Sequence, residues 1–330
     1  MTSWTNATTS VAATTSVAPP FVRGVLAPQR TEVIAGLQRY PVEHPALSPY
    51  VEHLWSVSWD RTDEPVWRAE VLTHPAVNLS VEQGHGPRHG YPMPAALVHG
   101  VVTRRFGIDL GGAGRVTAAR FRPGGFTAMT GRRVPRDTVL TAAGVLGEAY
   151  DHLMRDVLDP LGDVARVEVL EDALARAAPE PDQQYLELVA LLDRMQHDRT
   201  LTRVSAVADA SGVTTRSLQR TFERWIGVGP KWVLRRYRLQ DAAAAIDAGE
   251  VDDLAALATE LGWFDQPHFS RDFRSAVGTT PSTYLARARA DASPRGDNDS
   301  SDNDSSDNDG GGERNNDDRP SDRRGSPGHT

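Results

Sequence analysis

A short amphipathic unit occurs twice in the last part of the chain, and this repeat limits the possible folds more than any other feature. The first copy, VADASGVTTRSLQRTFERW, begins at residue 207, and the second, LATELGWFDQPHFSRDFR, begins at residue 257. Leu218 aligns with Phe269 at an offset of 51 residues, and the same offset maps Gly227 onto Gly278. Each copy predicts a short helix, a turn that contains glycine and a second amphipathic helix, which is the pattern of a helix-turn-helix.

The second helix of each copy has an apolar face and a face that carries arginine. At about 100° per residue, Leu218, Phe222 and Trp225 share one face of the first helix, and Phe269 and Phe273 share one face of the second. The opposite faces carry Arg216, Arg220, Arg271 and Arg274. The apolar faces are therefore expected in a core, and the arginines are expected to be available to a partner.

A single helix is predicted between the two copies. The run PKWVLRRYRLQDAAAAIDAG begins with proline, is rich in alanine and ends with glycine, which predicts one helix of about 18 residues and about 27 Å. Such a helix can hold two recognition helices roughly one turn of DNA apart, about 34 Å. Thr214 and Asp265 are suitable N-cap residues for the two second helices. The periodicity alone leaves open an ordinary helical domain that binds no DNA.

Charge is distributed unevenly along the chain. The formal net charge is −8, but residues 199–238 carry nine basic and two acidic residues, a net of +7. Residues 291–330 carry 11 acidic and five basic residues, a net of −6, in a low-complexity run that is expected to be disordered. The basic block favours an anionic partner. The acidic tail is interpreted either as a solubilising appendage or as a competitor of DNA for the basic block.

Composition excludes several classes of protein. The chain has no cysteine, which excludes disulfides, thiolate metal sites and cysteine nucleophiles and fits a cytoplasmic protein. No apolar run approaches the roughly 18 residues that a membrane span needs. Residues 1–25 are rich in Thr, Ser and Ala and are expected to be a disordered leader.

Residues 26–137 are expected to form a β-rich domain. Short runs such as YVEHLWSVSWD and LVHGVVTRRFGIDL are rich in valine, leucine and aromatic residues and are separated by Gly and Pro, which predicts a small barrel or sandwich. RPGG at 122–125 predicts a tight turn. Residues 138–182 are expected to be a helical connector that ends at the helix-breaking segment PEPD, residues 179–182. Residues 183–290 are expected to be fully helical.

The β-rich domain shows no catalytic motif. Its metal-ligand candidates by residue type are His74, His85, His89 and His99. Because no His-x-His pair with a following carboxylate occurs, we expect these to be exposed loop histidines, with no metal, cofactor or catalytic residue. A ligand pocket, if present, is expected to be lined by interior residues such as Trp55, Trp59 and Trp67.

Residues 183–289 resemble the DNA-binding domain of the AraC/XylS family of transcriptional regulators. The motif GWFDQPHFSRDF at 262–273, followed by Gly278 and Pro281, carries the resemblance. Pro267 and Phe264 depart from the family pattern and leave open which bases the second helix reads. The stretches THPAVNLSVEQ and ARFRPGG resemble the cupin-like N-terminal domain of such regulators. The expected fold is an α+β multidomain chain with an N-terminal β-rich cupin-like barrel, following helices and a C-terminal all-α domain of two helix-turn-helix units joined by a long helix.

The resemblance implies which side chains meet DNA. The residues implied to face bases are Arg216, Gln219, Arg220, Gln266, His268, Ser270 and Arg271. Phosphate contacts are expected from Arg224, Arg235, Arg236 and Arg274. Two simpler interpretations stay open: Arg238 pairs within the domain with Asp241 or Asp247, and His268 caps its helix.

The function expected from the sequence is sequence-specific regulation of transcription, including activation. The expected partners are double-stranded DNA, RNA polymerase, a small-molecule effector at the N-terminal domain and a second copy of the chain, with no membrane partner. The alternatives are a non-specific architectural DNA binder and a metal-dependent enzyme with an attached DNA-binding domain. A DNA-repair protein that transfers alkyl groups to cysteine is excluded because the chain has no cysteine.

Overall fold

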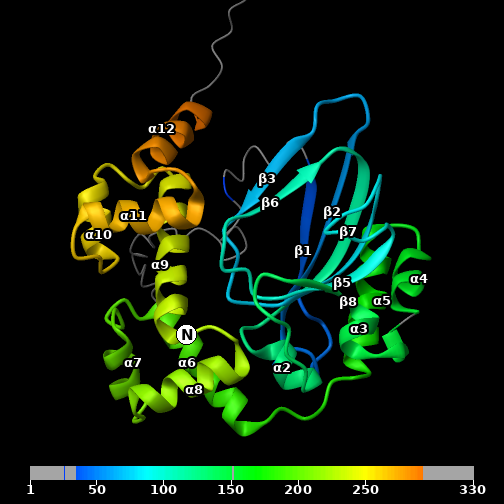
Figure 1. The fold of residues 1–330 in the computed structure, drawn as a ribbon, viewed down its shortest axis with the longest axis horizontal. Helices are drawn as coiled ribbons and strands as arrows, with labels where there is room; N and C mark the ends of the chain where they lie inside the picture. Colours follow the sequence, from blue (N-terminus) through cyan, green and yellow to red (C-terminus); the bar gives the residue numbers. More distant parts are fainter. Residues whose placement is uncertain (1–25, 27–34, 151, 293–330) are drawn as a thin grey trace, which may run out of the picture. The chain divides into compact units, whose positions relative to one another are not determined.

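The computed structural model describes residues 26, 35–150 and 152–292 of the chain. Strands precede most of the helices, and the last part is entirely helical (Figure 1). The expected α+β fold, with a β-rich N-terminal part and a helical C-terminal part, is therefore confirmed. The predicted leader at 1–25, and the acidic tail beyond residue 292, lie outside the described residues. Within the described ranges, no helix has the length and apolar character to span a membrane.

The strands pair in two antiparallel sheets. The larger sheet has the order β1-β2-β7-β4-β5-β8, and the smaller sheet pairs β3 with β6. The strands are β1 (Gly36–Tyr40), β2 (Val51–Arg61), β3 (Trp67–Val71), β4 (Asn78–Gly84), β5 (Ala95–His99), β6 (Phe106–Leu110), β7 (Gly112–Phe121) and β8 (Val139–Thr141). Residues of both sheets line one internal cavity. The sheets therefore face each other across this cavity.

Strand β2 is covered on both faces. Because side chains alternate along a strand, Trp55, Val57 and Trp59 line the cavity, whereas Leu54 lies in a core on the other face. Helix α5 (Asp163–Ala175) contacts β2 and β7. The larger sheet thus separates the cavity from the core that it shares with the helices.

The predicted tight turn at residues 122–125 is present and leads into helix α2 (Gly125–Thr130). The N–H of Gly125 donates to the carbonyl of Arg122 at 2.8 Å. Gly124 has a φ of 81°, which glycine adopts at little cost. A Cβ on Gly125 would collide with the carbonyl oxygen of Tyr50. The second glycine is thus required by close packing and the first by backbone conformation.

Helices follow the strands through the rest of the described chain. Around α5 lie α3 (Ala142–Leu146), the 3-10 turn η1 (Glu148–Tyr150) and α4 (Leu153–Leu158). The C-terminal helices are α6 (Gln183–His197), α7 (Val204–Ala210), α8 (Thr215–Trp225), α9 (Pro230–Asp247), α10 (Leu254–Glu260), α11 (Gln266–Val277) and α12 (Pro281–Ala292).

Helices α7 and α8 form the first helix-turn-helix unit, and α10 and α11 form the second. The Thr214 side chain accepts a hydrogen bond from the N–H of Ser217 at 3.1 Å, and Asp265 accepts one from the N–H of His268 at 2.7 Å. Both predicted N-caps are therefore confirmed. Gly227 and Gly278, which the repeat aligns, both have left-handed backbones, with φ of 83° and 86°. The repeat in sequence is a repeat in backbone conformation.

Helix α9 joins the two units and contributes to two separate cores. It has 18 residues, as predicted, and runs from the first unit to the second (Figure 1). Val233 and Tyr237 belong to a core that contains the first unit and continues into the β-rich part. Leu239 and Ile246 belong to a second core that contains the aromatic side chains of α11. Each half of the connecting helix is therefore buried against a different unit.

Two tyrosines connect the helical part to the β-rich part. The hydroxyl of Tyr185 donates to the carbonyl of Pro49 at 2.8 Å, and that of Tyr50 donates to the carbonyl of Pro179 at 3.0 Å. Their rings stack with centroids 5.7 Å apart. The segment 179–182 is thus held at its first residue by a hydrogen bond to the β-rich part.

The separation of the two cores predicts different effects for two equivalent substitutions. Phe222 and Phe273 are both fully buried, so replacing either with alanine should cost about 3–5 kcal/mol. In Phe273→Ala, faster amide hydrogen exchange should be confined to α10, α11, α12 and the end of α9. In Phe222→Ala it should extend to α6 and α2. Loss of protection throughout the larger sheet in Phe273→Ala would contradict the separation of the cores.

Candidate nucleic-acid interface

The predicted base-contacting residues of the first unit lie on α8. Leu218, Phe222 and Trp225 are buried, and the Thr214 cap fixes the start of the helix. The predicted base-contacting residues Arg216, Gln219 and Arg220 are all exposed. They line a shallow groove together with Glu223, Gly229, Pro230 and Lys231. The structure therefore brings these three side chains together on one accessible surface.

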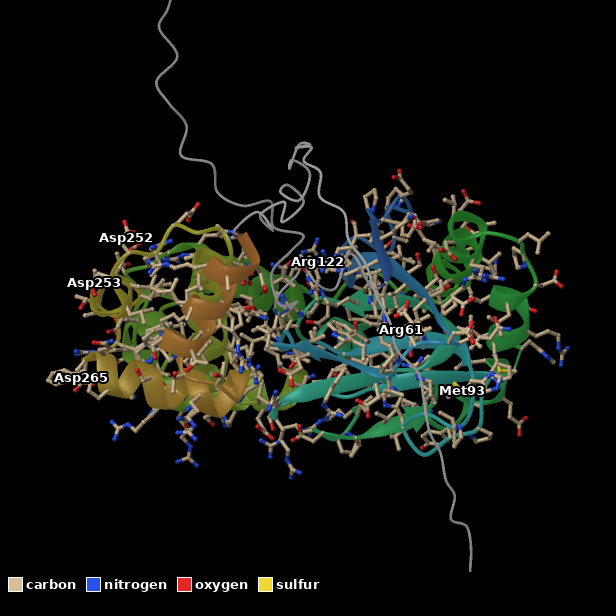
Figure 2. The ribbon with its side chains drawn as sticks, turned by 90° about the horizontal axis from the view of Figure 1, so that it is seen from above. Arg61, Met93, Arg122, Asp252, Asp253 and Asp265 are labelled. Carbon is tan, nitrogen blue, oxygen red and sulfur yellow. The ribbon has the colours of Figure 1, made fainter. Side chains whose placement is uncertain are left out.

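The second unit presents a matching face on α11. Gln266, His268 and Arg271 are exposed and Ser270 is half-buried. Figure 2 shows Asp265, at the beginning of α11, on the side of the helices away from the strands. The predicted residues of the second unit are thus at least partly accessible on α11. No described contact ties Arg271 to another side chain.

The side chain of His268 does not cap its helix. The cap is the Asp265 carboxylate, which accepts from the backbone N–H of His268. The imidazole Nε2 lies 3.6 Å from Oδ2 of Asp272, one helical turn away. Its ring remains exposed and available to a partner.

An apolar side chain stands at the entrance of the second recognition helix. Phe264 is 93% exposed, and Pro267 in the first turn of α11 is exposed as well. In the first unit the residue aligned with Phe264 is Val213, which is also exposed. The sequence identified Phe264 only as a departure from a family pattern. Its exposure adds an apolar group to the accessible face of this unit.

Three of the four arginines that were predicted to contact phosphates are accessible. Arg224 is exposed, with its guanidinium 4.9 Å from the centroid of the Trp225 ring, and Arg274 is exposed in the last turn of α11. Arg235 is partly exposed and lies 3.4 Å from Asp272. These positions are compatible with contacts to a nucleic-acid backbone.

Arg236 does not fit the predicted phosphate contact. It is only 3% exposed, donates to the carbonyl of Thr103 at 3.2 Å and lies over the Trp232 ring at 4.6 Å. Burial, together with the charge of Arg235, lowers the pKa of Arg236 to about 10. In this structure Arg236 therefore attaches α9 to the β-rich part. Its neighbour Arg235 points outward because adjacent residues on a helix face different directions.

Arg238 acts within the domain, although through partners that were not predicted. Its guanidinium donates to the carbonyl of Gly262 at 2.9 Å and to that of Leu261 at 3.4 Å. It also lies 5.1 Å from the centroid of the Trp263 ring. Asp247 instead accepts a hydrogen bond from the Tyr284 hydroxyl at 2.9 Å. Arg238 thus stabilises the turn between α10 and α11.

Sequence reasoning missed the polar contacts between α9 and the β-rich part. The amide of Gln240, which is buried, donates to the carbonyls of Leu72 at 3.2 Å and Thr73 at 3.3 Å. No local pattern marks Gln240, because its partners are backbone groups more than 160 residues away.

The cavity between the two sheets has a volume of about 200 Å³. Trp55 and Trp59 line it as predicted, whereas Trp67 packs beside it in a small core. Its polar wall includes His53, whose pKa is lowered to about 3 by burial and by the charge of Arg120. His53 is therefore neutral over the physiological pH range.

The expectation of exposed loop histidines is wrong for part of the set. His85 is exposed, but His99 is buried at the end of β5, and His89 is partly buried. Both lie beside the Glu82 carboxylate, with His99 Nε2 3.1 Å from Oε1 and His89 Nε2 3.5 Å from Oε2. The fold brings these residues together although they are distant in sequence.

Two family matches agree with this organisation. Residues 207–287 match the family described as "Helix-turn-helix domain", and residues 41–138 match "Domain of unknown function (DUF6597)". The first match covers α8, α9 and α11 with both reading faces. The chain therefore carries a helix-turn-helix domain in its helical part and a match to a domain of unknown function in its β-rich part.

Individual relatives are similar over parts of the chain. An uncharacterized HTH-type transcriptional regulator of Haemophilus influenzae is 25% identical over 138 residues, which are 39% of this chain and 45% of that protein. The transcriptional activator RhrA of Rhizobium meliloti is 35% identical over 88 residues, 26% of this chain and 28% of that one. This chain thus spans less than half the length of either relative.

A solved structure is similar over the helical part. The probable AraC family transcriptional regulator from Rhodopseudomonas palustris is 25% identical, over 31% of this chain and 96% of that chain, with a TM-score of 0.28. In the present chain the match to the helix-turn-helix domain is preceded by the match to DUF6597.

The different positions of the arginines predict different salt dependences of DNA binding. Each lost phosphate contact should lower the slope of log affinity against log salt by about 1. We expect this for Arg224→Ala and Arg274→Ala in gel-shift titrations at several salt concentrations. Arg236→Ala should keep the slope and instead lower the Tm. The substitution leaves the part-buried carbonyl of Thr103 without its donor, which should lower the free energy of unfolding by about 1–3 kcal/mol. An equal loss of slope in Arg236→Ala would show that this arginine reaches DNA.

Proposed function

We propose that the chain is a sequence-specific regulator of transcription that reads two successive major grooves of double-stranded DNA. The observation that carries the proposal is the pair of exposed faces on α8 and α11. Each face presents an arginine, Arg220 or Arg271, on a helix that is capped at its start and anchored by buried aromatic side chains. A cytoplasmic location follows from this function.

The chemistry of both faces suits base recognition. The guanidinium of arginine can donate two hydrogen bonds to O6 and N7 of guanine, and the glutamine amide can pair with adenine. Arg216, Gln219 and Arg220 supply these groups on the first helix, and Gln266 and Arg271 supply them on the second. His268 and Ser270 add further polar groups to the second face. We propose all seven residues as base contacts.

The connecting helix supports the use of two grooves. At 1.5 Å per residue, the 18 residues of α9 extend about 27 Å, which is close to one turn of DNA, about 34 Å. The small difference can be met by bending the DNA toward the protein. Arg224, Arg235 and Arg274 are proposed to contact phosphates at the edges of the two grooves.

The proposal predicts the loss of site preference in two variants. Arg220→Ala and Arg271→Ala should each lose about 1–3 kcal/mol of binding to a DNA site selected from a random pool, while their far-UV circular dichroism stays unchanged. Arg155→Ala is the matched control, because Arg155 is exposed on α4, outside the helix-turn-helix units. Its affinity should equal that of wild type in gel shifts.

The same assay separates the proposal from an architectural DNA binder. Equal affinity of wild type and both variants for the selected site would refute base reading by these arginines. A selection that returns no common sequence, together with a footprint without boundaries, would instead support non-specific binding.

We also propose that the β-rich domain binds a small-molecule effector in the cavity between its sheets. The cavity combines apolar walls from Trp55, Val57 and Ile108 with a few polar groups, which is the usual lining of a ligand site. Its volume of about 200 Å³ limits the effector to a compact molecule. Thr73 and Val102 line the cavity next to the segment that holds α9.

Filling the cavity should abolish the response to such a ligand. A compound at 100 times its Kd stabilises its protein by about 2.7 kcal/mol, so hits in a thermal-shift screen are detectable as a higher Tm. We expect compounds that raise the Tm of wild type not to raise that of Ile108→Trp. Val164→Trp, on an exposed position of α5, should respond like wild type. Hits that stabilise all three proteins equally would place the ligand elsewhere.

The remaining roles are proposed on the family and the division of the chain. We propose residues 26–137 as the sensor or dimerisation domain, 138–182 as connector and 183–290 as the DNA-binding domain. We further propose a homodimer, which sedimentation at micromolar concentration would test, and activation through contact with RNA polymerase. In vitro transcription from a promoter that carries the selected site would reveal activation or its absence.

A further inference from the structure

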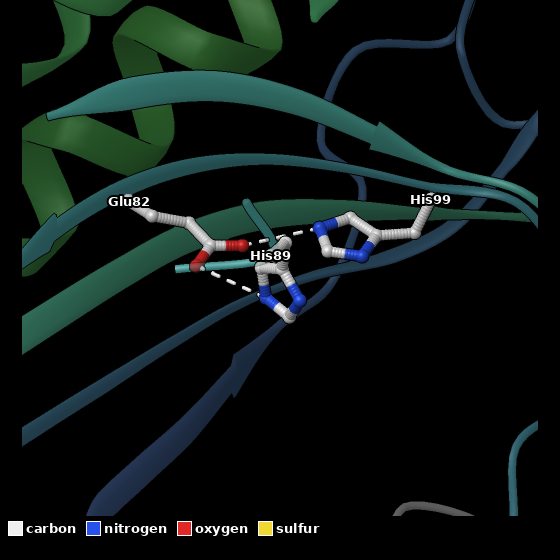
Figure 3. A group of neighbouring side chains, drawn as sticks. All are labelled: Glu82, His89 and His99. Atoms are coloured by element: carbon white, nitrogen blue, oxygen red, sulfur yellow. Dashed lines mark hydrogen bonds and ion pairs between the residues drawn. The ribbon is translucent and has the colours of Figure 1, made fainter. Parts of the chain in front are cut away.

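Three side chains that can bind a metal ion converge beside the cavity of the β-rich domain (Figure 3). Glu82 lies in β4, His99 ends β5, and His89 lies in the loop between these strands. In the antiparallel register Asn78 pairs with His99, and Glu82 shares the face of Asn78 because the two are an even number of residues apart. Glu82 and His99 therefore point to the same side, into the cavity.

The loop conformation brings the third side chain to this pair. His89 has a φ of 53°, in the left-handed region, and its ring lies edge-on to that of His99 with centroids 4.9 Å apart. The possible ligand atoms of the three residues all lie within 4.8 Å of one another. Two imidazoles and one carboxylate are thus gathered around a common point (Figure 3).

The separations between these atoms match those of ligands on one metal ion. With bonds of about 2.1 Å, two ligands at octahedral or tetrahedral angles lie about 3.0–3.4 Å apart. The observed distances are 3.1 Å from Glu82 Oε1 to His99 Nε2 and 3.5 Å from Glu82 Oε2 to His89 Nε2. All the possible ligand atoms lie within 4.8 Å of one another, so they need to draw closer only where their separation exceeds this range.

The hydrogen bonding of the cluster is incomplete. Glu82 is 3% exposed, and neither its Oε2 nor Nε2 of His89 has a hydrogen-bond partner among the described residues. The Glu82 carboxylate therefore has an oxygen that can still accept a bond.

Neighbouring side chains support the carboxylate. The Ser80 hydroxyl donates to Glu82 Oε1 at 2.8 Å, which orients the carboxylate. The Arg88 guanidinium lies 3.8 Å from Glu82 Oε2 and is held over the Trp59 ring at 4.7 Å. Arg88 competes with a cation for the carboxylate charge, so the site favours an ion that also forms strong bonds to imidazole.

We propose that Glu82, His89 and His99 bind one divalent transition-metal ion at the wall of the cavity. Imidazole ligands suit Zn(II), Fe(II), Co(II) and Ni(II), whereas Ca(II) and Mg(II) prefer sites made entirely of oxygen. Three protein ligands leave at least one coordination position for water or a small ligand. The spacing of seven and ten residues between the ligands matches no short metal motif, and the sequence therefore predicted none.

The proposal is tested with untagged full-length protein that has been stripped with EDTA. Isothermal titration with Zn(II) should give one ion per chain, and Co(II) should give visible absorption bands of histidine coordination. His89→Asn and Glu82→Gln should each weaken binding at least tenfold and remove the Co(II) bands. His85→Ala is the matched control, because His85 lies near the same loop but is exposed, and it should bind like wild type.

The outcomes separate a metal site from a purely structural network. His89→Asn is the more informative variant, since His89 is only partly buried in a loop and its loss should leave the circular dichroism spectrum unchanged. A folded wild type that binds no ion, or equal binding by wild type and His89→Asn, would overturn the proposal. Neither result bears on the reading of DNA by α8 and α11, because those helices contribute no ligand.

Discussion

The burial of helix α9 is the constraint on which the rest of the structure depends. Its first half packs into the core of the first unit and the β-rich part, and its second half packs into the core of the second unit. Arg236 and Gln240 add hydrogen bonds to carbonyls of Thr103, Leu72 and Thr73. Because buried polar groups are costly unless paired, these bonds fix the rotation of α9 about its axis. The directions in which α8 and α11 face follow from that rotation.

The residues to which α9 is bonded also line the cavity or adjoin residues that line it. Thr73 lines the cavity, its hydroxyl donates to the carbonyl of Val102 at 2.9 Å, and its own carbonyl accepts from Gln240. Val102 lines the cavity too and precedes Thr103, which accepts from Arg236. The segments after β3 and β5 therefore touch both the cavity and the connecting helix.

Two kinds of polar site with opposite requirements are present in one chain. The predicted base-contacting side chains of α8 and α11 are exposed or half-buried on capped helices, so they are accessible to a partner. The cluster of Glu82, His89 and His99 is largely buried and contains ligand atoms without a hydrogen bond, so it gains from a partner that enters the fold. The exposed faces of α8 and α11 result from helix periodicity. The cluster forms only where two strands and the loop between them come together.

The sequence by itself determined several features that depend on neighbours within one or two helical turns. Thr214 and Asp265 cap their helices, the aromatic residues of α8 and α11 are buried, and α9 has its predicted length, because capping and amphipathic spacing act locally. The turn at 122–125 is local in the same way. Each of these features could be predicted from a few adjacent residues.

Only the tertiary structure decided which of several similar side chains are buried. Arg235 and Arg236 are adjacent and chemically identical, yet one is accessible and the other bonds to Thr103, because the β-rich part covers one side of α9. His85 and His99 differ in the same way, since the register of β4 and β5 turns His99 toward Glu82. These outcomes depend on contacts between segments far apart in the chain, and no local pattern of residues encodes them.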